Sequence, residues 1–492
     1  MTISNEAVLH FIAGAERPSA SERTFLSQNP ANGETLAEVA FGGPEDVDGA
    51  VDAAWAAFDS AVWRDLRGSE KARTLRRLAR LIEERVDDIA RIEALDVGKP
   101  LTAARGDVMA AVSLLEYFAT LPENIHGRVY TDEKGYFTYS RREPYGVVAA
   151  IAPWNFPFLL AAWKTAPALA VGNSVVLKMA EQTPISTSIY ARLCHEAGIP
   201  GGVVNVVHGD GSTTGAALVR HPRVRKVTFT GSTEVGRAIL GASADGIKSC
   251  HLELGGKSPN IVLRDADLDQ AVTGSLFTTF FNSGQICTSG SRLLIDEAVA
   301  DDFLERFRRR AHALRIGDPL DADTQLGPLV SQDQLDRVQG YIESGVEAGA
   351  TLVMGGSRLR PPGLEHGYFI EPTVFGDVEP HMKIAQEEIF GPVLAVLRFK
   401  TEDQAISLAN DVAYGLAATV WTTGLNRAFL FAEQLEAGIV WTNCPHHLQW
   451  NIPYEGHKHS GLGEDLGLEA INTFTQLKVN YINFTGDAYQ WA

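Results

Sequence analysis

The sequence predicts an α/β protein built on two parallel β-sheets covered by helices, with further strands outside both sheets. Three observations lead to this class. Short runs rich in β-branched residues alternate with helical stretches from about residue 145, a second such alternation begins near residue 290, and two isolated segments alternate apolar and polar residues. Strands separated by segments long enough for a crossover helix are typical of parallel sheets with helices on both faces.

The elements of the two units follow from hydrophobic periodicity. Residues 45–119 carry apolar side chains at helical spacing, and Gly-Lys-Pro at 98–100 marks a helix end. The strand candidates of the first unit are residues 146–152, 174–178, 203–207, 226–230 and 259–263. Those of the second unit are residues 292–296, 351–356, 393–399 and 417–423.

The two isolated segments predict strands outside the main cores. Residues 127–146 alternate around a turn at Lys134 and Gly135, as a hairpin does, and residues 473–485 alternate in the same way. Unpaired strand edges tend to pair with a further strand, so we expect these segments to join subunits into a homo-oligomer.

The composition and charge of the chain argue against nucleic acid, metal and membrane as partners. A chain of 492 residues is long enough for about three domains. The formal charge of -18 repels phosphate backbones, so we expect no nucleic-acid partner. Four widely separated cysteines form neither a disulfide framework nor a CxxC metal motif, and we expect no bound metal. The N-terminus lacks the pattern of a signal peptide, and the longest apolar region, residues 145–178, is broken by prolines and lysine. We therefore expect a cytoplasmic protein without a membrane partner.

Polar residues follow the first two strands of the parallel series. Trp154 and Asn155 stand in a Pro-Trp-Asn-Phe-Pro segment, and Lys178 precedes Glu181 by three positions. Ligands of open α/β sheets bind beyond the carboxyl ends of the strands. Taken singly, the first segment also fits an ordinary proline-bounded turn, and the lysine and glutamate fit a surface ion pair.

A possible phosphate loop follows the fourth strand. Gly231 and Ser232 precede a helical stretch that contains Gly236, and a helix N-terminus offers backbone N–H donors to a phosphate. The GxGxxG dinucleotide pattern is absent, and plain helix capping accounts for the segment nearly as well.

Two further residues have the chemistry of a nucleophile and a base. Glu253 lies in an apolar, glycine-rich segment, where burial would raise its pKa toward that of a general base. Cys287 lies in a glycine-flanked loop, although free cysteines are more often buried and inert than catalytic. Glu388 lies at the start of a further predicted strand, where its carboxylate can reach a ribose.

Order and spacing remove the ambiguity of the single motifs. The series PWNFPF, LKMAEQTP, FTGSTEVG, LELGGKS, GQIC and EEIFGP resembles the aldehyde dehydrogenase superfamily along essentially the whole chain. The resemblance implies that Cys287 attacks an aldehyde, that Asn155 and the Cys287 N–H hold the oxyanion, and that Glu253 activates the water that releases a carboxylic acid.

The resemblance also implies a cofactor and a fold. It places NAD, with NADP as the alternative, against Trp154, Lys178, Glu181, Gly231, Ser232, Gly236, Leu254, Glu388 and Phe390. Glu181 favours NAD because a carboxylate repels a 2′-phosphate. The implied domains are a Rossmann-like cofactor domain (1–122 and 145–254), an α/β catalytic domain (255–470) and a small β oligomerisation arm (123–144 and 471–492) that makes a dimer or tetramer.

The substrate is less defined. The implied tunnel is lined by Phe156, Trp163, Phe281, Leu448 and Tyr454. These walls suit an aromatic or medium aliphatic aldehyde, and together with Glu455 they would suit a cationic one such as betaine aldehyde or an aminoaldehyde. Asp107 matches one acidic position of the aminoaldehyde enzymes, but Ala110 stands where they often have a second acid. The family's proton-relay acid falls on Asp465, but the altered Glu-Asp there puts that role in doubt. A CoA-acylating semialdehyde dehydrogenase and a cysteine esterase without redox chemistry are the alternatives.

Overall fold

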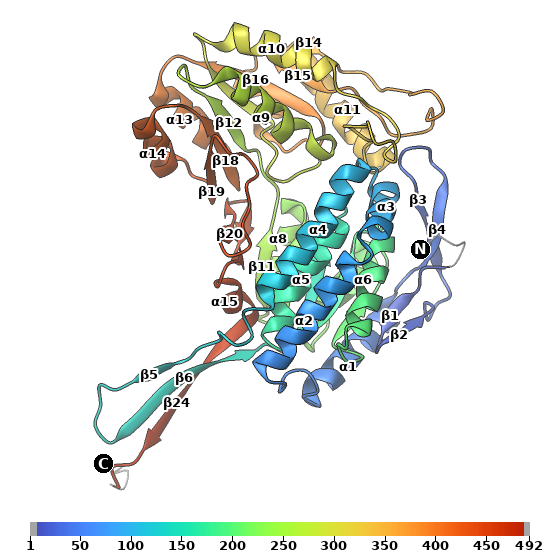
Figure 1. Ribbon diagram of the computed structural model, residues 1–492, viewed down its shortest axis with the longest axis vertical. Helices are drawn as coiled ribbons and strands as arrows, with labels where there is room; N and C mark the ends of the chain where they lie inside the picture. The colour runs from blue at the N-terminus through green and yellow to red at the C-terminus, as the bar shows by residue number, and fades with distance from the viewer. Residues whose placement is uncertain (1–6, 487–492) are drawn as a thin grey trace.

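The computed structural model describes residues 7–486. Figure 1 shows two lobes stacked on one another and an arm that projects from the lower lobe. The lower lobe contains an eight-stranded sheet in the order β2 (Ala15–Arg17), β1 (His10–Ile12), β9 (Val204–Val206), β8 (Ser174–Met179), β7 (Val147–Ala152), β10 (Val224–Thr230), β11 (Ser249–Glu253) and β22 (Gly461–Leu462). The strands from β9 to β11 in this order run parallel, whereas the edge pairings of β2 with β1, β1 with β9 and β22 with β11 are antiparallel.

Helices cover both faces of this sheet because its strands are apolar on both sides. In β7, Val148 and Ala150 pack into one core cluster, and Val147 and Ala149 pack into another, as strand alternation requires. The first face is covered by α2 (Gly68–Glu83), α3 (Val86–Val97), α4 (Leu101–Phe118), α5 (Pro157–Ala170) and α6 (Ile185–Glu196). The second is covered by α1 (Pro44–Asp59), α7 (Ala216–Arg220) and α8 (Thr233–Ala244). This is the Rossmann-like unit that the sequence predicts.

The upper lobe contains a seven-stranded sheet. Its order is β14 (Thr351–Met354), β15 (Thr373–Gly376), β16 (Val393–Phe399), β13 (Arg292–Asp296), β12 (Pro259–Val262), β18 (Ala417–Trp421) and β19 (Ile439–Thr442), and all neighbours except β14 and β15 run parallel. One face is covered by α9 (Leu268–Phe280) and α10 (Ala300–His312). The other is covered by α11 (Gln332–Glu347), α12 (Lys383–Gln386), α13 (Glu402–Asn410) and α14 (Leu425–Gln434).

The arm is a three-stranded antiparallel sheet in the order β24 (Thr475–Asn483), β6 (Tyr136–Pro144) and β5 (Arg128–Tyr130). The turn between β5 and β6 contains Gly135, whose φ of 83° is accessible to glycine. The predicted hairpin and tail strand are therefore confirmed, and they belong to one sheet. Of the tail assigned to the arm, residues 487–492 lie outside the described part of the chain.

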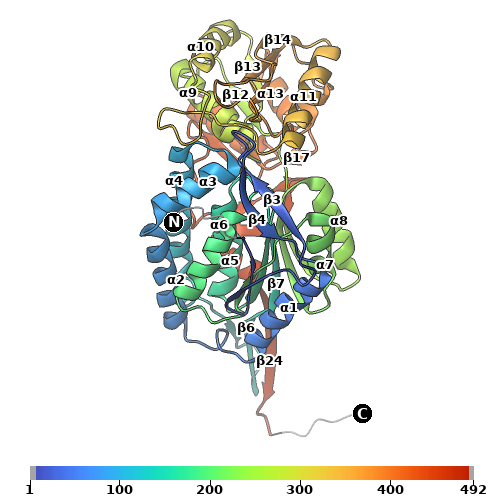
Figure 2. The same cartoon turned by 90° about the vertical axis from the view of Figure 1, so that its right-hand side faces the viewer.

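Small elements connect the lobes. The hairpin of β3 (Thr24–Gln28) and β4 (Thr35–Ala40) rises from the lower lobe toward the upper one (Figure 2), where the Tyr368 N–H donates to the Pro30 carbonyl at 3.0 Å. Near the C-terminus, β20 (Pro453–Glu455) pairs with β23 (Glu464–Leu466), β21 (His457–Lys458) pairs with β17 (Tyr414–Gly415), and α15 (Ala470–Phe474) leads into the arm. Within residues 7–486, no helix has the length and hydropathy needed to cross a membrane.

One assignment of the sequence analysis is wrong. Residues 259–263 were expected to continue the first parallel series, but β12 lies in the second sheet, and the place beside β10 is taken by β11. Periodicity does not reveal where the chain crosses between sheets. The Ser-Cys-His-Leu-Glu sequence of β11 also lacks the β-branched residues on which strand recognition depends.

Candidate active site

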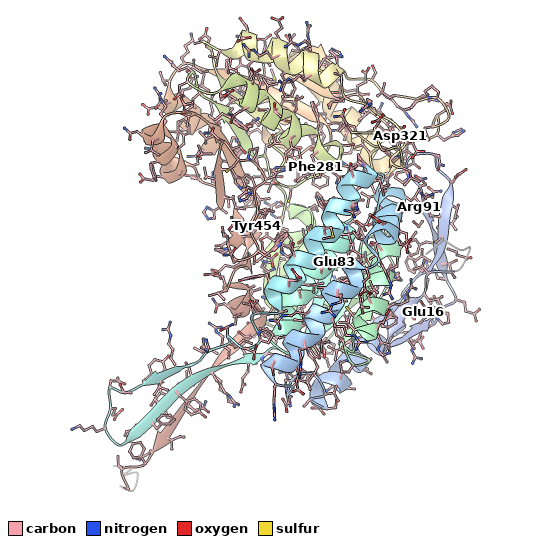
Figure 3. The ribbon with its side chains drawn as sticks, in the orientation of Figure 1. Glu16, Glu83, Arg91, Phe281, Asp321 and Tyr454 are labelled. Atoms are coloured by element: carbon pink, nitrogen blue, oxygen red, sulfur yellow. The ribbon has the colours of Figure 1, made fainter. Side chains whose placement is uncertain are left out.

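A cavity of about 520 Å³ lies between the two lobes. It is lined by loops that follow β7, β10 and β11 of the lower lobe and by the segment between α9 and β13 of the upper lobe. Figure 3 labels Phe281 and Tyr454, two of its wall residues, in the region where the upper lobe meets the helices of the lower one. Residues predicted for the site that line this cavity are Trp154, Asn155, Phe156, Trp163, Gly231, Ser232, Glu253, Leu254, Phe281, Cys287, Glu388, Phe390, Leu448 and Tyr454.

The loop that carries Cys287 has a fixed, unusual backbone. Within the turn at Phe281–Gly284, Asn282 and Ser283 have φ values of 49° and 54°, in the left-handed region that side chains disfavour. Hydrogen bonds hold this turn: Ser283 Oγ donates to the Gly327 carbonyl at 2.8 Å, and Gln285 Oε1 accepts from the Val330 N–H at 3.0 Å. Backbone strain of this kind persists only where the surroundings enforce it, and such sites are often functional.

Asn155 is tied directly to that loop. It follows β7, and its side-chain Nδ2 donates to the Gln285 carbonyl at 2.9 Å. Its own backbone carbonyl accepts from Lys99 Nζ at 2.7 Å and from Asn282 Nδ2 at 3.1 Å. Lys99 is itself held by Asp107 at 2.6 Å. The Asn155 amide, which has a second N–H, is therefore positioned beside the cysteine by a buried network.

Two glycines after β11 allow the lobes to approach closely. A Cβ on Gly256 would lie 2.3 Å from the carbonyl oxygen of Cys287, and a Cβ on Gly255 would lie 2.3 Å from Glu388 Oε2. Glu388 uses this approach to accept the Gly256 N–H through Oε1 at 3.0 Å. Because Gly255 and Gly256 lack side chains, Glu388 and the Cys287 carbonyl can pack against the end of β11.

Cys287 lies in an electrostatic setting that disfavours its thiolate. Burial, together with the carboxylates of Glu388 and Glu253, raises the pKa of the Cys287 thiol to about 12. The Tyr454 hydroxyl, 3.9 Å from Cys287 Sγ, acts in the opposite direction. Burial also raises the pKa of Glu388 to about 7.

Glu253 ends β11 and is 5% exposed. Burial, and then the nearby charge of Asp465, raise the pKa of the Glu253 carboxyl well above its usual range. Asp465 forms a buried ion pair with Lys164 at 2.8 Å. Burial opposes ionisation of Asp465, but electrostatic attraction to His251 and Lys164, together with hydrogen bonding to Lys164 and Trp163, outweighs it and lowers its pKa. The pair of carboxylates in the cavity wall thus has one member with a raised pKa and one that stays charged.

His251, Glu253 and Asp465 are the described residues whose ligand atoms come together as a metal would require, within 4.8 Å of one another. The Lys164 ammonium already neutralises Asp465, and a second cation beside it would be repelled. We assign no metal to these residues.

The remaining nucleotide-site candidates lie on the lower lobe, outside the cavity lining. Lys178 is buried at the end of β8, and its Nζ lies 3.2 Å from the half-exposed carboxylate of Glu181. Ser232, which does line the cavity, caps α8 by accepting the Val235 N–H, and a Cβ on Gly236 in that helix would lie 2.5 Å from Leu254. These residues lie at or after the ends of β8 and β10, the two strands that flank β7, although Lys178 and Glu181 are separate from the cysteine cavity.

Several wall residues were not predicted from the sequence. Phe277, Trp441 and His446 line the cavity, with His446 packed 5.5 Å from both aromatic rings. No role is predicted for His446 from the sequence. Lys99 is not predicted for the site either, and its one signal in the sequence is the Gly-Lys-Pro that ends a helix. Glu455, considered as a partner for a cationic substrate, does not line the cavity.

The fold and this cavity define a two-lobed α/β enzyme with a thiol, an amide and carboxylates at the lobe junction. Comparison with known proteins gives the family. The profile of the aldehyde dehydrogenase family matches residues 17–480. An aldehyde dehydrogenase of Emericella nidulans is 47% identical over 487 residues, which are 99% of this chain and 95% of that protein. The mitochondrial aldehyde dehydrogenase of Homo sapiens is 45% identical over 471 residues, 95% of this chain and 90% of that protein.

Solved structures agree. The NAD+ complex of aldehyde dehydrogenase from Bacillus cereus superposes with a TM-score of 0.96 at 43% identity, covering 98% of this chain and 97% of that one. A betaine aldehyde dehydrogenase mutant from Staphylococcus aureus, in complex with NAD+, gives 0.97 at 36% identity, covering 99% and 98%. The chain belongs to the aldehyde dehydrogenase family, which confirms the resemblance found in the sequence and the enzyme class that it implied.

Proposed function

We propose that this protein oxidises a neutral aromatic or medium aliphatic aldehyde to the carboxylic acid, with NAD as the electron acceptor. The observation that carries the proposal is the meeting of Cys287, Asn155 and Glu253 in one cavity, beside Glu388. A thiol, an oxyanion donor and a carboxyl with a raised pKa are the three groups that acyl transfer through a thioester requires.

In the first half-reaction Cys287 acts as the nucleophile in its thiolate form, after its proton has passed to solvent water. The thiolate sulfur adds to the aldehyde carbonyl, and the carbonyl electron pair moves to oxygen to give a thiohemiacetal anion. The free N–H of the Asn155 amide and the Cys287 backbone N–H stabilise that anion, because both are preorganised donors in a buried site. Bound NAD would accept the hydride that leaves the same carbon, and a thioester on Cys287 results.

In the second half-reaction Glu253 acts as the general base. It removes a proton from water, the hydroxide adds to the thioester carbonyl, and the Cys287 sulfur leaves as the carboxylic acid is released. A base with a raised pKa transfers protons efficiently near neutral pH. Glu253 also favours water over CoA as the acyl acceptor.

The residues of the lower lobe fit a dinucleotide. The N-terminus of α8, capped by Ser232 and preceded by Gly231, offers N–H groups to a pyrophosphate. The buried Lys178 ammonium and the half-exposed Glu181 carboxylate suit the hydroxyls of a ribose, and Glu181 would repel a 2′-phosphate. The relatives bound to NAD+ support NAD as the cofactor.

The cavity favours an uncharged aldehyde. Its walls are aromatic, with Trp163 in edge contact with Trp450 at 5.6 Å and Phe156 stacked near Phe281 at 6.5 Å. Two of the acidic side chains that line it are compensated, because Lys99 holds Asp107 and Lys164 holds Asp465, and the other two, Glu253 and Glu388, are proposed to serve the reaction and the cofactor. A cationic substrate would therefore meet cation–π faces but no free carboxylate dedicated to it.

We infer that the chain divides into a cofactor domain (1–122 and 145–254), a catalytic domain (255–470) and an arm (123–144 and 471–492). The arm joins subunits into a dimer or tetramer. Supporting this, β24 is a nine-residue edge strand that pairs with β6 and with no other strand among the described residues. Such an edge, with exposed apolar residues including Tyr481 at 74%, is suited to pairing across subunits.

The test is a substrate panel with the purified enzyme. We expect NADH formation with benzaldehyde and hexanal, a higher kcat/KM than with betaine aldehyde, a preference for NAD over NADP, and free acid as the product. Acyl-CoA formed in preference to acid when CoA is present would indicate the acylating alternative. Ester hydrolysis without any NADH formation would indicate a cysteine esterase.

A further inference from the structure

Three buried polar atoms face one another behind the cavity. His251 Nε2 lies 3.7 Å from Glu253 Oε1 and 3.7 Å from Asp465 Oδ1. His251 is completely buried, and none of the three atoms has a hydrogen-bond partner within residues 7–486. Buried polar atoms are rarely left without a partner, and at 3.7 Å, just beyond hydrogen-bond length, a small movement of either carboxylate brings it within reach of a proton on Nε2.

The hydrogen bond made by Nδ1, the other ring nitrogen of His251, determines which of the two nitrogens carries the proton. His251 Nδ1 lies 3.0 Å from Thr228 Oγ1, which stands directly opposite on the neighbouring strand β10. When the threonine hydroxyl donates to Nδ1, the ring proton is on Nε2 and points between the two carboxylates. Burial lowers the pKa of His251 to about 3, so the ring is neutral and carries a single proton.

We propose that His251 is a positioning residue for the reaction, and that its Nε2–H is shared by Glu253 and Asp465 and keeps the Glu253 carboxylate ionised and oriented. The proposal rests on the proposed role of Glu253 as the general base. His251 does not line the cavity, so it acts only through Glu253.

The surrounding charges show why such a donor matters. Asp465 and Glu455 both disfavour ionisation of Glu253, and Lys164 favours it. Lys164 is bonded to the other oxygen of Asp465, and Lys226 is directed to Ser249 at 3.1 Å, so neither ammonium is hydrogen-bonded to Glu253. Two close carboxylates in a buried site repel each other until one takes a proton. An N–H between them reduces that repulsion and lowers the pKa of the base.

The decisive comparison is between His251→Leu, which removes the donor, and His251→Gln, which keeps an N–H donor. The readouts are the presteady-state burst of NADH, the decay of the acyl-enzyme followed by intact mass, and the pH dependence of that decay. For His251→Leu we expect a retained burst, acyl-enzyme decay slowed about tenfold near neutral pH, and an acidic limb shifted upward by about one pH unit. His251→Gln should restore part of the rate of acyl-enzyme decay and should reverse part of the shift of the acidic limb.

Other outcomes overturn the proposal. If the NADH burst and the rate of acyl-enzyme decay fall equally, and the acidic limb of the pH profile is not shifted, His251 only stabilises the fold. A limb that shifts after dialysis against EDTA would mean that a metal, rather than a shared proton, links the three residues. If the leucine variant does not fold, Thr228→Val tests the same arrangement, because it removes the partner of Nδ1; an unshifted limb there contradicts the proposal.

Failure of the proposed function is separately visible. Glu253→Gln should retain the burst and lose acyl-enzyme decay. If that variant still hydrolyses the thioester, the role of Glu253 is wrong, whatever the His251 variants do.

Discussion

At the scale of single residues, the reactivity of Cys287 depends on its neighbours. Cys287 is half-buried near two carboxylates, which oppose the thiolate, and among the described residues the Tyr454 hydroxyl is the side-chain donor within 4 Å of the sulfur. Bound cofactor and substrate would have to be accommodated beside Glu388, which here is directed into the end of β11. The chemistry of the cysteine is therefore set by contacts from three different segments.

Replacing Cys287 by alanine removes the nucleophile and leaves the nucleotide contacts on the lower lobe intact. We expect Cys287→Ala to bind NAD with unchanged affinity, measured by calorimetry, and to form no NADH from any aldehyde. Substantial dehydrogenase activity in this variant would contradict the assignment. Cys444→Ser, at an exposed cysteine, is the matched control.

Replacing Tyr454 by phenylalanine removes a donor to the thiolate while keeping the aromatic wall. Because hydrogen bonds to charged groups contribute about 1.5–3 kcal/mol, with sulfur at the weak end, we expect the pKa of Cys287 to rise by about one unit. Alkylation of Cys287 by iodoacetamide, followed by peptide mass in a Cys444→Ser background, should then slow about tenfold at a given pH. Tyr117→Phe, which loses a hydroxyl without a described partner, should not change the alkylation rate.

At the scale of elements, β11 and the two glycines after it determine the site more than any helix does. This strand carries His251 and Glu253, and Gly255 and Gly256 then bring Glu388 and the Cys287 carbonyl to within contact of its end. The sequence analysis identified the segment by its glutamate and glycines but not as a strand. A short polar strand buried between sheet neighbours has no periodic signal of its own, because tertiary packing decides its conformation.

Gly256→Ala tests this close approach. The new Cβ would meet the Cys287 carbonyl oxygen at 2.3 Å, and since that atom belongs to the backbone, the cysteine loop must move. A displacement of about 1 Å can cost on the order of a hundredfold in rate, so we expect kcat/KM for the aldehyde to fall by about that factor. Gly241→Ala on α8, where the Cβ meets nothing within 4 Å, is the control and should leave kcat/KM unchanged. An active Gly256→Ala enzyme would contradict the contact.

At the scale of the whole molecule, the cavity exists only because two lobes with separate sheets meet. Cys287 comes from the upper lobe, and Asn155 and Glu253 come from the lower one. Tyr454 and Asp465 come from β20 and β23, which pair with each other near the C-terminus and bring the chain back beside the first sheet. The arm lies outside both lobes and presents the long free edge of β24 (Figure 1).

The proposed assembly can be tested on that edge. Val479 and Tyr481 are 43% and 74% exposed on β24, and aspartate at both positions would place unpaired charge in an interface. We expect Val479→Asp/Tyr481→Asp to reduce the particle mass in light scattering from that of a dimer or tetramer toward that of one chain. Leu425→Asp, at a residue 70% exposed on α14, is the control. A wild-type protein that is monomeric would contradict the proposal.

The sequence by itself determined the two α/β units, the arm strands and the family, because strand alternation, helical periodicity and motif order are local properties of the chain. It also named Asn155, Glu253 and Cys287 and the aromatic walls. Only the tertiary structure decided that Lys99 pairs with Asp107, that Lys164 pairs with Asp465, and that His251 faces Glu253 and Asp465. Of these, the contacts of Asp465 with Lys164 and His251 join residues far apart in the chain. The burial and the charged neighbours of these side chains are therefore set by tertiary packing and not by their neighbours in the sequence.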